Sequence, residues 1–372
     1  LFAQTQPMPH CGTSEAMHEL FESDPAAKAR YDQHLDAFNK EVENAPRSKE
    51  AAQHQESGAK TLSIYPLDTI AVVFHVLHTY GAENVSDQVL INALAQVNRD
   101  YRKLDPDTTQ IEPAFIPVAD AANVVFALAK KDPFGNCTSG IVRHYDPNTN
   151  WNRTQANGNG YNNYSYSGTA AGQWDPRKYI NVYIVKDIYT GNPASGGTVI
   201  GYTYLPGTWS PGDRRDAIVY NYQFLNGYDA RSLSHEIGHW LNLIHTFGST
   251  NSPGSIACQA SNNDDFVGDT PWTKGYFSTC PKSNPTTGCS TIENIENIMD
   301  YSSCPRMFSA GQVTRMRTAM TSTTAGRNNL TTPANKIATG IDGSVQNVCA
   351  PVADFSSKMK FICEGASVNL TD

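Results

Sequence analysis

The sequence predicts an α/β fold, and three local patterns carry this prediction. Residues 69–74 form a β-branched and aromatic run that is typical of a strand. Apolar residues at helical spacing follow after Ser86, and two further strand-like segments occupy residues 124–128 and 179–185. A strand followed by a helix and by more strands is the order of an α/β layer. With 372 residues and a mass of 40.7 kDa, the chain is long enough for one large domain or two ordinary ones.

The N-terminal part is predicted to be helical. Residues 14–43 are mostly helix formers, and their apolar side chains recur at roughly helical spacing. These side chains are Leu20, Phe21, Tyr31, Leu35 and Phe38. From Pro46 to Lys60 the chain is rich in charged residues, Gln and Ser, a composition typical of an exposed linker that is open to proteolysis. We therefore expect a helical pre-segment with its linker over residues 1–60.

The remaining elements follow from local signals along the chain. Ser86 can cap a helix that carries apolar residues on one face, namely Leu90, Leu94, Val97, Tyr101 and Leu104. Residues 157–172 are too rich in Gly and Asn for regular structure, so we expect a loop there. The strand-like segments 351–355 and 366–370 are too short to fold alone. The segment over residues 350–372 resembles the start of a PKD-type β-sandwich, so we expect it to begin a further domain that the sequence truncates.

Composition excludes several classes of partner. The 28 basic residues are outnumbered by 36 acidic ones, so the chain lacks the basic footprint of a nucleic-acid-binding protein. The most apolar stretch, 69–77, is too short to cross a bilayer. Eight cysteines in a polar chain without a close CxxC pair are typical of an oxidising compartment. We expect a secreted protein, and the first four residues resemble the tail of a cleaved signal peptide.

One motif carries the chemistry of this sequence. His235, Glu236 and His239 form an HExxH motif, and His245 follows six residues after the second histidine. On a helix, positions four apart differ by about 40° around the axis, so His235 and His239 can share one metal ion. Glu236 is rotated by about 100° from His235, which directs its carboxylate beside the metal, where it can take a proton from a bound water.

His245 can join the other two histidines only if the helix ends first. In a continuous helix it would lie about 240° away and about 9 Å along the axis from His239. The break is needed near Asn242, and Asn enters the left-handed backbone conformation more readily than most residues. Three histidines around a metal with an open fourth position are the ligand set of a catalytic zinc, so the motif predicts zinc-dependent hydrolysis.

Two alternatives to this ligand set stay open at the level of the sequence. A gluzincin-type zinc hydrolase would use a downstream Glu, such as Glu293 or Glu296, as its third ligand. A binding module or adhesin with a purely structural metal would close the site with four protein ligands and would catalyse no hydrolysis. The intact Glu236 favours a hydrolase over the binding module.

The segment HEIGHWLNLIHTFG resembles the zinc motif HExxHxxGxxH of the metzincin metallopeptidases, and most closely that of the pappalysin family. Weaker similarity, including FHVLH, YINVYIV and VIGYTYLP, extends over about residues 65–325. The resemblance implies a catalytic domain over residues 61–340, with a twisted mixed five-stranded sheet, helices above it and an irregular lower subdomain. It also implies a monomeric endopeptidase whose substrates are proteins or peptides, in which a zinc-bound water attacks the peptide carbonyl with Glu236 as general base and then acid.

A second segment, NIMDY, resembles the Met-turn of the same family. The resemblance implies that Met299 is a hydrophobic pedestal beneath the metal and that Tyr301 is a transition-state donor. The sequence departs from the family pattern at Asn242, where the consensus has Gly. It departs again at Ser302 and Ser303. Some family members prefer Arg or Lys after the scissile bond, and these members carry acidic residues at the corresponding positions.

The resemblance also implies a structural calcium site and two disulfides. Pappalysin-like enzymes bind calcium in the region that here contains Asp264, Asp265, Asp269 and Thr270, and clustered carboxylates suit a hard cation. Two disulfides pin the same region in the family, and the expected pairs are Cys258–Cys289 and Cys280–Cys304. Four cysteines allow three pairings, so the sequence does not decide between them. Cys137 and Cys349 are left without an assigned partner.

A final resemblance concerns latency. The segment PHCGTSE resembles the cysteine switch of metzincin zymogens, in which a Cys takes the open zinc position, although His10 replaces the usual Arg. Zinc lowers the pKa of a thiol and holds it as thiolate, so Cys11 would block the metal until the pro-segment is cut away. The chain would then carry its own intramolecular inhibitor, with activating cleavage between about residues 46 and 62. In the alternative, Cys11 forms a disulfide, for example with Cys137.

Overall fold

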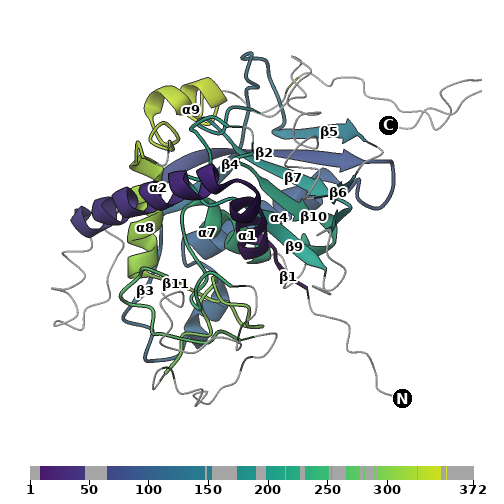
Figure 1. Ribbon diagram of the computed structural model, residues 1–372. Coiled ribbons are helices and arrows are strands. Elements are labelled where there is room, and N and C mark those ends of the chain that lie inside the picture. The colour runs from purple at the N-terminus through teal and green to yellow at the C-terminus, as the bar shows by residue number, and fades with distance from the viewer. Residues whose placement is uncertain are drawn as a thin grey trace, which may run out of the picture.

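The structure is a computed structural model (Figure 1). The residues that it describes are 9–46, 65–146, 149–152, 174–189, 198–213, 215–226, 231–250, 253, 265–276, 280, 289, 292–324, 326–344 and 349. The expected loop 157–172, the expected boundary near residue 60 and the strand-like segments after residue 350 lie outside them. No helix in the described part of the chain is long and apolar enough to span a membrane.

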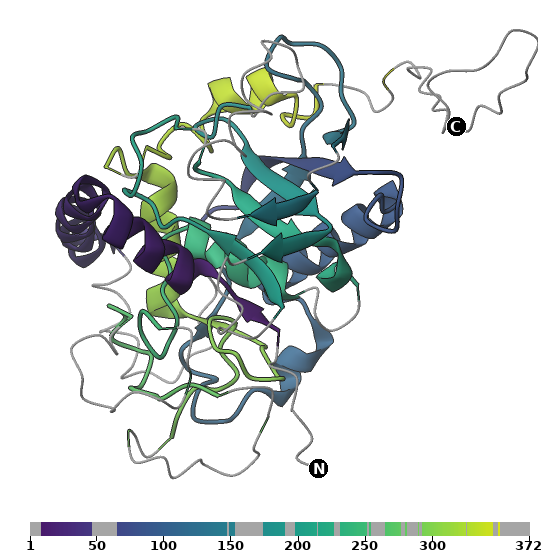
Figure 2. The same ribbon diagram turned by 45° about the vertical axis from the view of Figure 1, so that its right-hand side comes forward.

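A mixed sheet forms the centre of the molecule, as the sequence predicts (Figure 2). Its order is β1-β9-β10-β7-β2-β4, with β5 also paired to β2, and the β9–β10 pair is antiparallel while the other pairs are parallel. The strands are β1 (His10–Cys11), β2 (Asp68–His78), β4 (Val124–Leu128), β5 (Ile141–Tyr145), β7 (Ile180–Val185), β9 (Val199–Thr203) and β10 (Ile218–Asn221).

The described sheet has seven strands, whereas the family resemblance implied five. One reason is the length of β2, whose first half pairs with β4 and whose second half pairs with β5. The other reason is β1, which belongs to the N-terminal pre-segment and extends the sheet in parallel along β9. Both additions come from long-range pairing, which local periodicity does not encode.

Alternate residues of β2 face two different cores, as expected for a strand that is buried on both faces. The larger core lies between the sheet and three helices, α4 (Asp87–Tyr101), α7 (Arg231–Trp240) and α8 (Ala310–Thr321). The β2 residues on this side are Ile70, Val72, Phe74 and Val76. On the other side, Ala71 and Val73 pack with Trp174 and Tyr179, close to helix α9 (Pro333–Thr339).

Helix α4 follows the predicted apolar face with one correction. Leu90, Leu94, Val97 and Tyr101 are buried against the sheet. The helix ends at Tyr101, so Leu104 lies beyond it and is 54% exposed. Ser86 stands at the N-cap, although its side chain makes no capping hydrogen bond.

The predicted N-terminal helical segment is two helices, α1 (Thr13–Ser23) and α2 (Pro25–Asn44). Pro25 cannot continue α1, and Asp24 caps α2 by accepting hydrogen bonds from the backbone N–H groups of Ala26 and Ala27. Helix α1 lies against β9, and α2 extends to α8 (Figures 1 and 2). The pre-segment therefore crosses the face of the molecule from the edge of the sheet to α8.

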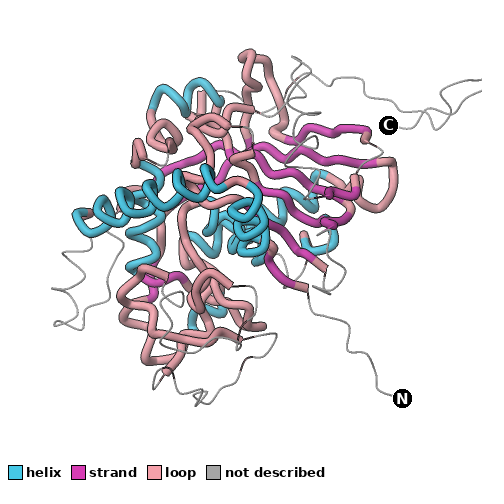
Figure 3. Tube along the Cα trace, viewed as in Figure 1, coloured by secondary structure: helices cyan, strands magenta, loops and turns pink. Residues whose placement is uncertain are grey.

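The described chain after His245 is mostly loop, in agreement with the predicted irregular lower subdomain (Figure 3). Shorter elements complete the structure: β3 (Ala119–Asp120), β6 (Asn150–Asn152), β8 (Asp187–Tyr189), β11 (Phe308–Ser309), η1 (Pro106–Gln110) and η4 (Tyr222–Phe224). The structure contains the Cys280–Cys304 disulfide that the resemblance implied, and a Cys137–Cys349 disulfide that was not assigned. Cys289 is also disulfide-bonded, whereas Cys258 lies outside the described residues.

Candidate metal centre

Helix α7 positions the first two histidines of the motif. Its apolar residues Leu233, Ile237 and Trp240 pack into the larger core, so the opposite face carries His235 and His239. The Nε2 atoms of these two histidines are 3.0 Å apart. The spacing of four residues therefore brings both rings to one point, as helix geometry requires.

The end of α7 brings the third histidine back to the same point. Asn242 adopts the left-handed conformation, with φ of 73°, where the sequence requires a break. The N–H of Leu243 donates to the Gly238 carbonyl at 2.9 Å, and the N–H of Asn242 donates to the His239 carbonyl at 2.9 Å. These two bonds define a Schellman motif, which reverses the chain at a helix C-terminus. As a result, His245 Nε2 lies 3.0 Å from His239 Nε2.

The other ring nitrogen of each histidine is held by the protein. His235 Nδ1 lies 2.7 Å from the Ile298 carbonyl oxygen, and His239 Nδ1 lies 2.8 Å from the Leu243 carbonyl oxygen. A ring that donates its Nδ1–H to a carbonyl presents a lone pair at Nε2. His245 Nδ1 is 3.3 Å from Ser14 Oγ in the pre-segment. The three rings therefore direct their Nε2 atoms at each other.

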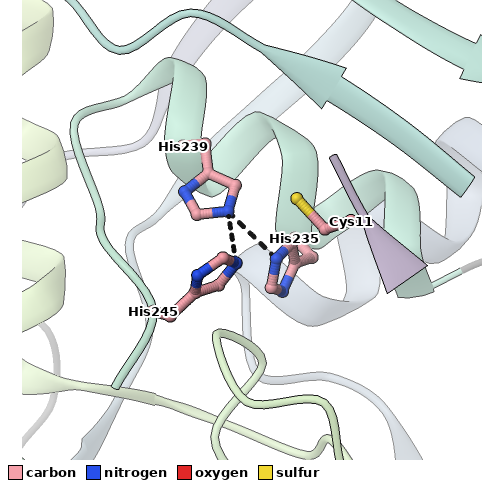
Figure 4. A group of neighbouring side chains, drawn as sticks. All are labelled: Cys11, His235, His239 and His245. Carbon is pink, nitrogen blue, oxygen red and sulfur yellow. Dashed lines mark hydrogen bonds between the residues drawn. The ribbon is translucent and has the colours of Figure 1, made fainter. Parts of the chain in front are cut away.

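This arrangement fits a metal ion that prefers nitrogen and sulfur ligands. Burial lowers the pKa of His235 to about 4 and the pKa values of His239 and His245 well below their usual range, so the rings are neutral. Nε2 lone pairs 3.0 Å apart repel one another unless a cation lies between them. Cys11 Sγ belongs to the same group, and the four candidate ligand atoms lie within 4.8 Å of one another (Figure 4). Imidazole and thiolate are the ligands that zinc prefers.

Glu236 lies beside this group and outside it. Its side chain is fully buried against β9, where a Cβ atom added at Gly201 would come within 3.0 Å of Glu236 Cγ. Burial raises the pKa of Glu236 to about 8, and hydrogen bonds to Cys11 and Thr13 oppose this rise. Thr13 Oγ1 donates to the carboxylate at 3.3 Å and accepts from the Thr203 backbone N–H at 3.1 Å.

The segment that resembles a Met-turn lies against α7 and beside the histidine rings. Met299 is fully buried, and a Cβ atom added at Gly238 would come within 2.6 Å of Met299 Sδ, so the methionine packs directly against α7. The ring of Tyr301 lies 4.8 Å from the His245 ring, between centroids. The Tyr301 hydroxyl donates to the Cys11 carbonyl at 3.0 Å.

A cavity of about 220 Å³ opens beside His235 and Glu236. Its wall includes Ser302 and Ser303, the two residues that depart from the family pattern, and Arg231. The Arg231 guanidinium forms ion pairs with three carboxylates at 2.7–3.2 Å, those of Asp100, Asp105 and Asp107. Sequence analysis did not find this cluster, because Arg231 lies more than 120 residues after the three aspartates in the chain.

The structure bears on two alternatives left open by the sequence. Among the described residues the metal-ligand group contains neither Glu293 nor Glu296. Glu293 accepts a hydrogen bond from Thr273 Oγ1, and Glu296 pairs with Arg306. The gluzincin alternative therefore has no support. The disulfide alternative for Cys11 is wrong, because Cys11 is a buried free thiol and Cys137 is bonded to Cys349.

Two of the residues expected to bind calcium, Asp265 and Asp269, accept hydrogen bonds within the protein. Asp265 accepts from Thr270 Oγ1 at 2.9 Å and from the Val267 N–H at 3.1 Å. Asp269 accepts from Ser309 Oγ at 2.6 Å and from the Gly311 N–H at 2.8 Å, which ties its loop to the start of α8. Asp264 lies outside the described residues, and the calcium site stays a prediction.

Comparisons with known proteins agree with this geometry. Residues 163–321 match the peptidase family described as pregnancy-associated plasma protein-A. An extracellular metalloprotease 1 of Coccidioides posadasii is 33% identical over 159 residues, which are 40% of this chain and 51% of that protein. An extracellular metalloprotease of Arthroderma benhamiae is 33% identical over 168 residues, 42% of this chain and 52% of that protein. The chain thus spans about half the length of these curated relatives.

Two solved structures from Tannerella forsythia are similar over more of the chain. Mature mirolysin in complex with a cleaved peptide is 28% identical, with a TM-score of 0.61, and the match covers 74% of this chain and 99% of that one. A promirolysin mutant is 26% identical, with a TM-score of 0.64, and the match covers 88% of this chain and 98% of that one. The larger share of this chain is thus matched by the pro-form.

Proposed function

We propose that this chain is a secreted zinc-dependent endopeptidase made as a latent zymogen. The proposal starts from the match of residues 163–321 to the pappalysin-type peptidase family. The observation that carries the proposal is the convergence of three neutral imidazoles on one point with a carboxylate beside them. The named relatives are extracellular metalloproteases, and two disulfides in the described chain suit an oxidising compartment.

In this proposal His235, His239 and His245 hold the zinc ion. When bound, zinc supplies Lewis acidity, which polarises a peptide carbonyl and makes water a stronger acid. The protein keeps the three rings neutral by burial and fixes the tautomers of His235 and His239 through the carbonyls of Ile298 and Leu243. The zinc site therefore needs no large rearrangement of the rings when the metal binds.

Glu236 is the proposed general base and acid. Its carboxylate neighbours the imidazole group without belonging to it, so it can accept a proton from the attacking water and return it to the leaving amine. Tyr301 is the proposed donor to the developing oxyanion. In support of this role, its hydroxyl already donates to a peptide carbonyl, that of Cys11, beside the three rings.

Latency in this proposal depends on contacts between the pre-segment and each of these groups. Cys11 Sγ faces the three rings. Thr13 Oγ1 donates a hydrogen bond to the Glu236 carboxylate, and the Cys11 carbonyl accepts one from the Tyr301 hydroxyl. Burial and the neighbouring Glu236 raise the pKa of the Cys11 thiol, whereas a bound metal would favour the thiolate. Residues 1–60 would thus act as an intramolecular inhibitor until cleavage between about residues 46 and 62 removes them.

Three finer statements complete the proposal. Residues 61–340 are the proposed catalytic domain, and residues 350–372 the proposed start of a PKD-like domain. Substrates are proteins or peptides, cleaved by a monomer. The loop containing Asp265 and Asp269 is the proposed place of a structural calcium ion.

The proposal is tested by Glu236→Ala, compared with the native chain after limited trypsin treatment of both. We expect the variant to retain one zinc per chain, measured by metal analysis, because Glu236 is not a ligand. We expect it to lose hydrolysis of casein and gelatin by several orders of magnitude, because the variant lacks the proposed base. Unchanged cleavage of either protein by the variant would refute the proposed mechanism, and a native chain that binds zinc without any hydrolysis would support the binding-module alternative.

A further inference from the structure

The turn at the end of α7 controls the positions of two imidazoles at once. The carbonyl of Leu243 lies 2.8 Å from His239 Nδ1 and so fixes that ring. The same turn directs the chain to His245 three residues after Asn242. A change in the backbone at Asn242 would therefore displace both rings together. Because a non-glycine residue is strained in the left-handed conformation, the turn needs support from its surroundings.

Arg315 supplies this support from helix α8. Its Nε donates to the main-chain carbonyl of Asn242 at 2.7 Å, and its Nη2 donates to Asn242 Oδ1 at 3.1 Å. The guanidinium presents its donors in a rigid planar fork. It can therefore bond the main-chain carbonyl and Oδ1 of Asn242 together only when these two oxygens keep the spacing that the left-handed turn gives them. Arg315 is 1% exposed, which keeps water from replacing these bonds.

The same face of α8 also holds the segment that resembles the Met-turn. Gln312, one turn before Arg315, exchanges hydrogen bonds with the Asn297 side chain at 2.8 and 3.0 Å. Asn297 precedes Ile298, whose carbonyl fixes His235, and it accepts from the N–H of Met299 at 2.9 Å. Helix α8 thus contacts both segments that orient the three rings.

We propose that Arg315 is a positioning residue for the metal centre, acting through Asn242 to hold His239 and His245 in their converging arrangement. The inference rests on the proposed function, in which these histidines hold zinc. A third donor, Nη1, reaches Asn39 in pre-segment helix α2 at 2.7 Å, and the Phe38 ring lies 5.1 Å from the guanidinium carbon. The two bonds to Asn242 join residues within the proposed catalytic domain.

Arg317 offers a matched control on the same helix. It is also buried, it donates to Asp68 at 2.7 Å, and its guanidinium carbon lies 4.9 Å from the centre of the Tyr65 ring. In the described part of the chain its hydrogen bonds go to Asp68 and to the Ala122 carbonyl, and not to Asn242 or to the segment with Asn297. Replacing either arginine by Met removes a buried guanidinium from α8, but only Arg315→Met removes the support of the turn.

The experiment measures zinc affinity in the full chain by competition with a chelator, together with thermal unfolding. We expect Arg315→Met to weaken zinc binding at least tenfold, and Arg317→Met to leave it within about twofold even where the two melting temperatures fall equally. Equal effects of the two variants on zinc affinity, or no effect of Arg315→Met, would overturn the inference. A native chain that binds no zinc would instead overturn the proposed function.

A second set of variants tests whether Arg315 acts through Asn242. This set also keeps the inference testable if Arg315→Met does not fold. Asn242→Gly relieves the strain of positive φ and removes the Oδ1 acceptor, so combining it with Arg315→Lys should weaken zinc binding by less than the product of the two separate effects. Amide hydrogen exchange at Leu243 in the metal-free chain should rise at least tenfold in Arg315→Lys and stay unchanged in Arg317→Lys. Independent effects on zinc binding, or unchanged exchange in both variants, would overturn the inference.

Discussion

Gly238 lies inside α7, immediately before His239, and its replacement by Ala sets two effects of opposite sign against each other. In a helix interior, Ala is favoured over Gly by about 1 kcal/mol. Against this, the added Cβ atom would lie 2.6 Å from Met299 Sδ and 3.5 Å from Leu243 Cδ1. Unstrained contacts between such heavy atoms are about 3.5–4.0 Å, so the Cβ and the sulfur would overlap by about 1 Å.

Met299 has little freedom to relieve this overlap. Its side chain is fully buried, and its backbone N–H is held by Asn297 Oδ1 at 2.9 Å. Overpacking of a core costs about 1–3 kcal/mol. We therefore expect Gly238→Ala to lower the free energy of unfolding by up to about 2 kcal/mol, after the gain in helix propensity is subtracted. Urea denaturation followed by tryptophan fluorescence measures this change, and the activity of the trypsin-treated chain on casein should fall as well.

A double-mutant cycle isolates the contact with the sulfur. Met299→Ala removes the sulfur atom, so Gly238→Ala in that background should be neutral or stabilising by up to about 1 kcal/mol. If Gly238→Ala were equally destabilising with and without the methionine side chain, the packing of Met299 against α7 would not be the cause. A single variant more stable than the native chain would refute the argument outright.

The remaining predictions concern latency and pH. Cys11→Ala in the full chain should give casein hydrolysis before any trypsin treatment. Thr13→Val should give a smaller rise in casein hydrolysis, because it frees only the Glu236 carboxylate. Full latency of Cys11→Ala would contradict the blocking role. Burial raises the pKa of Asp100 to about 6, with the nearby Arg231 opposing the rise. Because the folded chain then binds this proton more tightly than the unfolded chain, the stability of the native chain relative to Asp100→Asn should fall by about 2–3 kcal/mol as pH rises from 4 to 6. Urea midpoints of both proteins across this range test the sign, and a difference that grows with pH would show the opposite linkage.

The candidate metal centre was largely predictable because its determinants are local. The spacing of His235 and His239 follows from helix geometry, and the need for a break before His245 follows from six further residues. Asn242 was identified from its tolerance of positive φ, which the structure shows as 73°. These inferences need only the chain between residues 235 and 245 and the geometry of one helix.

The contacts that support the centre could not be predicted in the same way. Thr13 is 223 residues from Glu236, and Arg315 is 73 residues from Asn242. Periodicity and turn signals describe neighbours along the chain, so they contain no information on which distant side chains meet. The pairing of β1 with β9 and the division of β2 between two partners have the same origin.

Two helix boundaries differ from those that apolar spacing alone predicts. Pro25 after Asp24 marks a helix boundary, because proline follows a capping residue at the start of many helices, and it divides the predicted segment 14–43. Leu104 continues the apolar spacing of α4 but follows Lys103, whose φ of 52° ends the helical path. In the second case the spacing alone gave no warning, since an exposed leucine fits the same pattern.

X-ray absorption at the zinc edge tests the central claim most directly, because it reports the atoms around the metal in the latent and the activated chain. In the latent chain we predict three nitrogen neighbours of zinc, and one sulfur neighbour at about 2.3 Å from the metal. After activation we predict that the sulfur is replaced by an oxygen or nitrogen atom. A zinc ion with no sulfur neighbour in the latent chain, or with the same four protein ligands in both forms, would contradict the account.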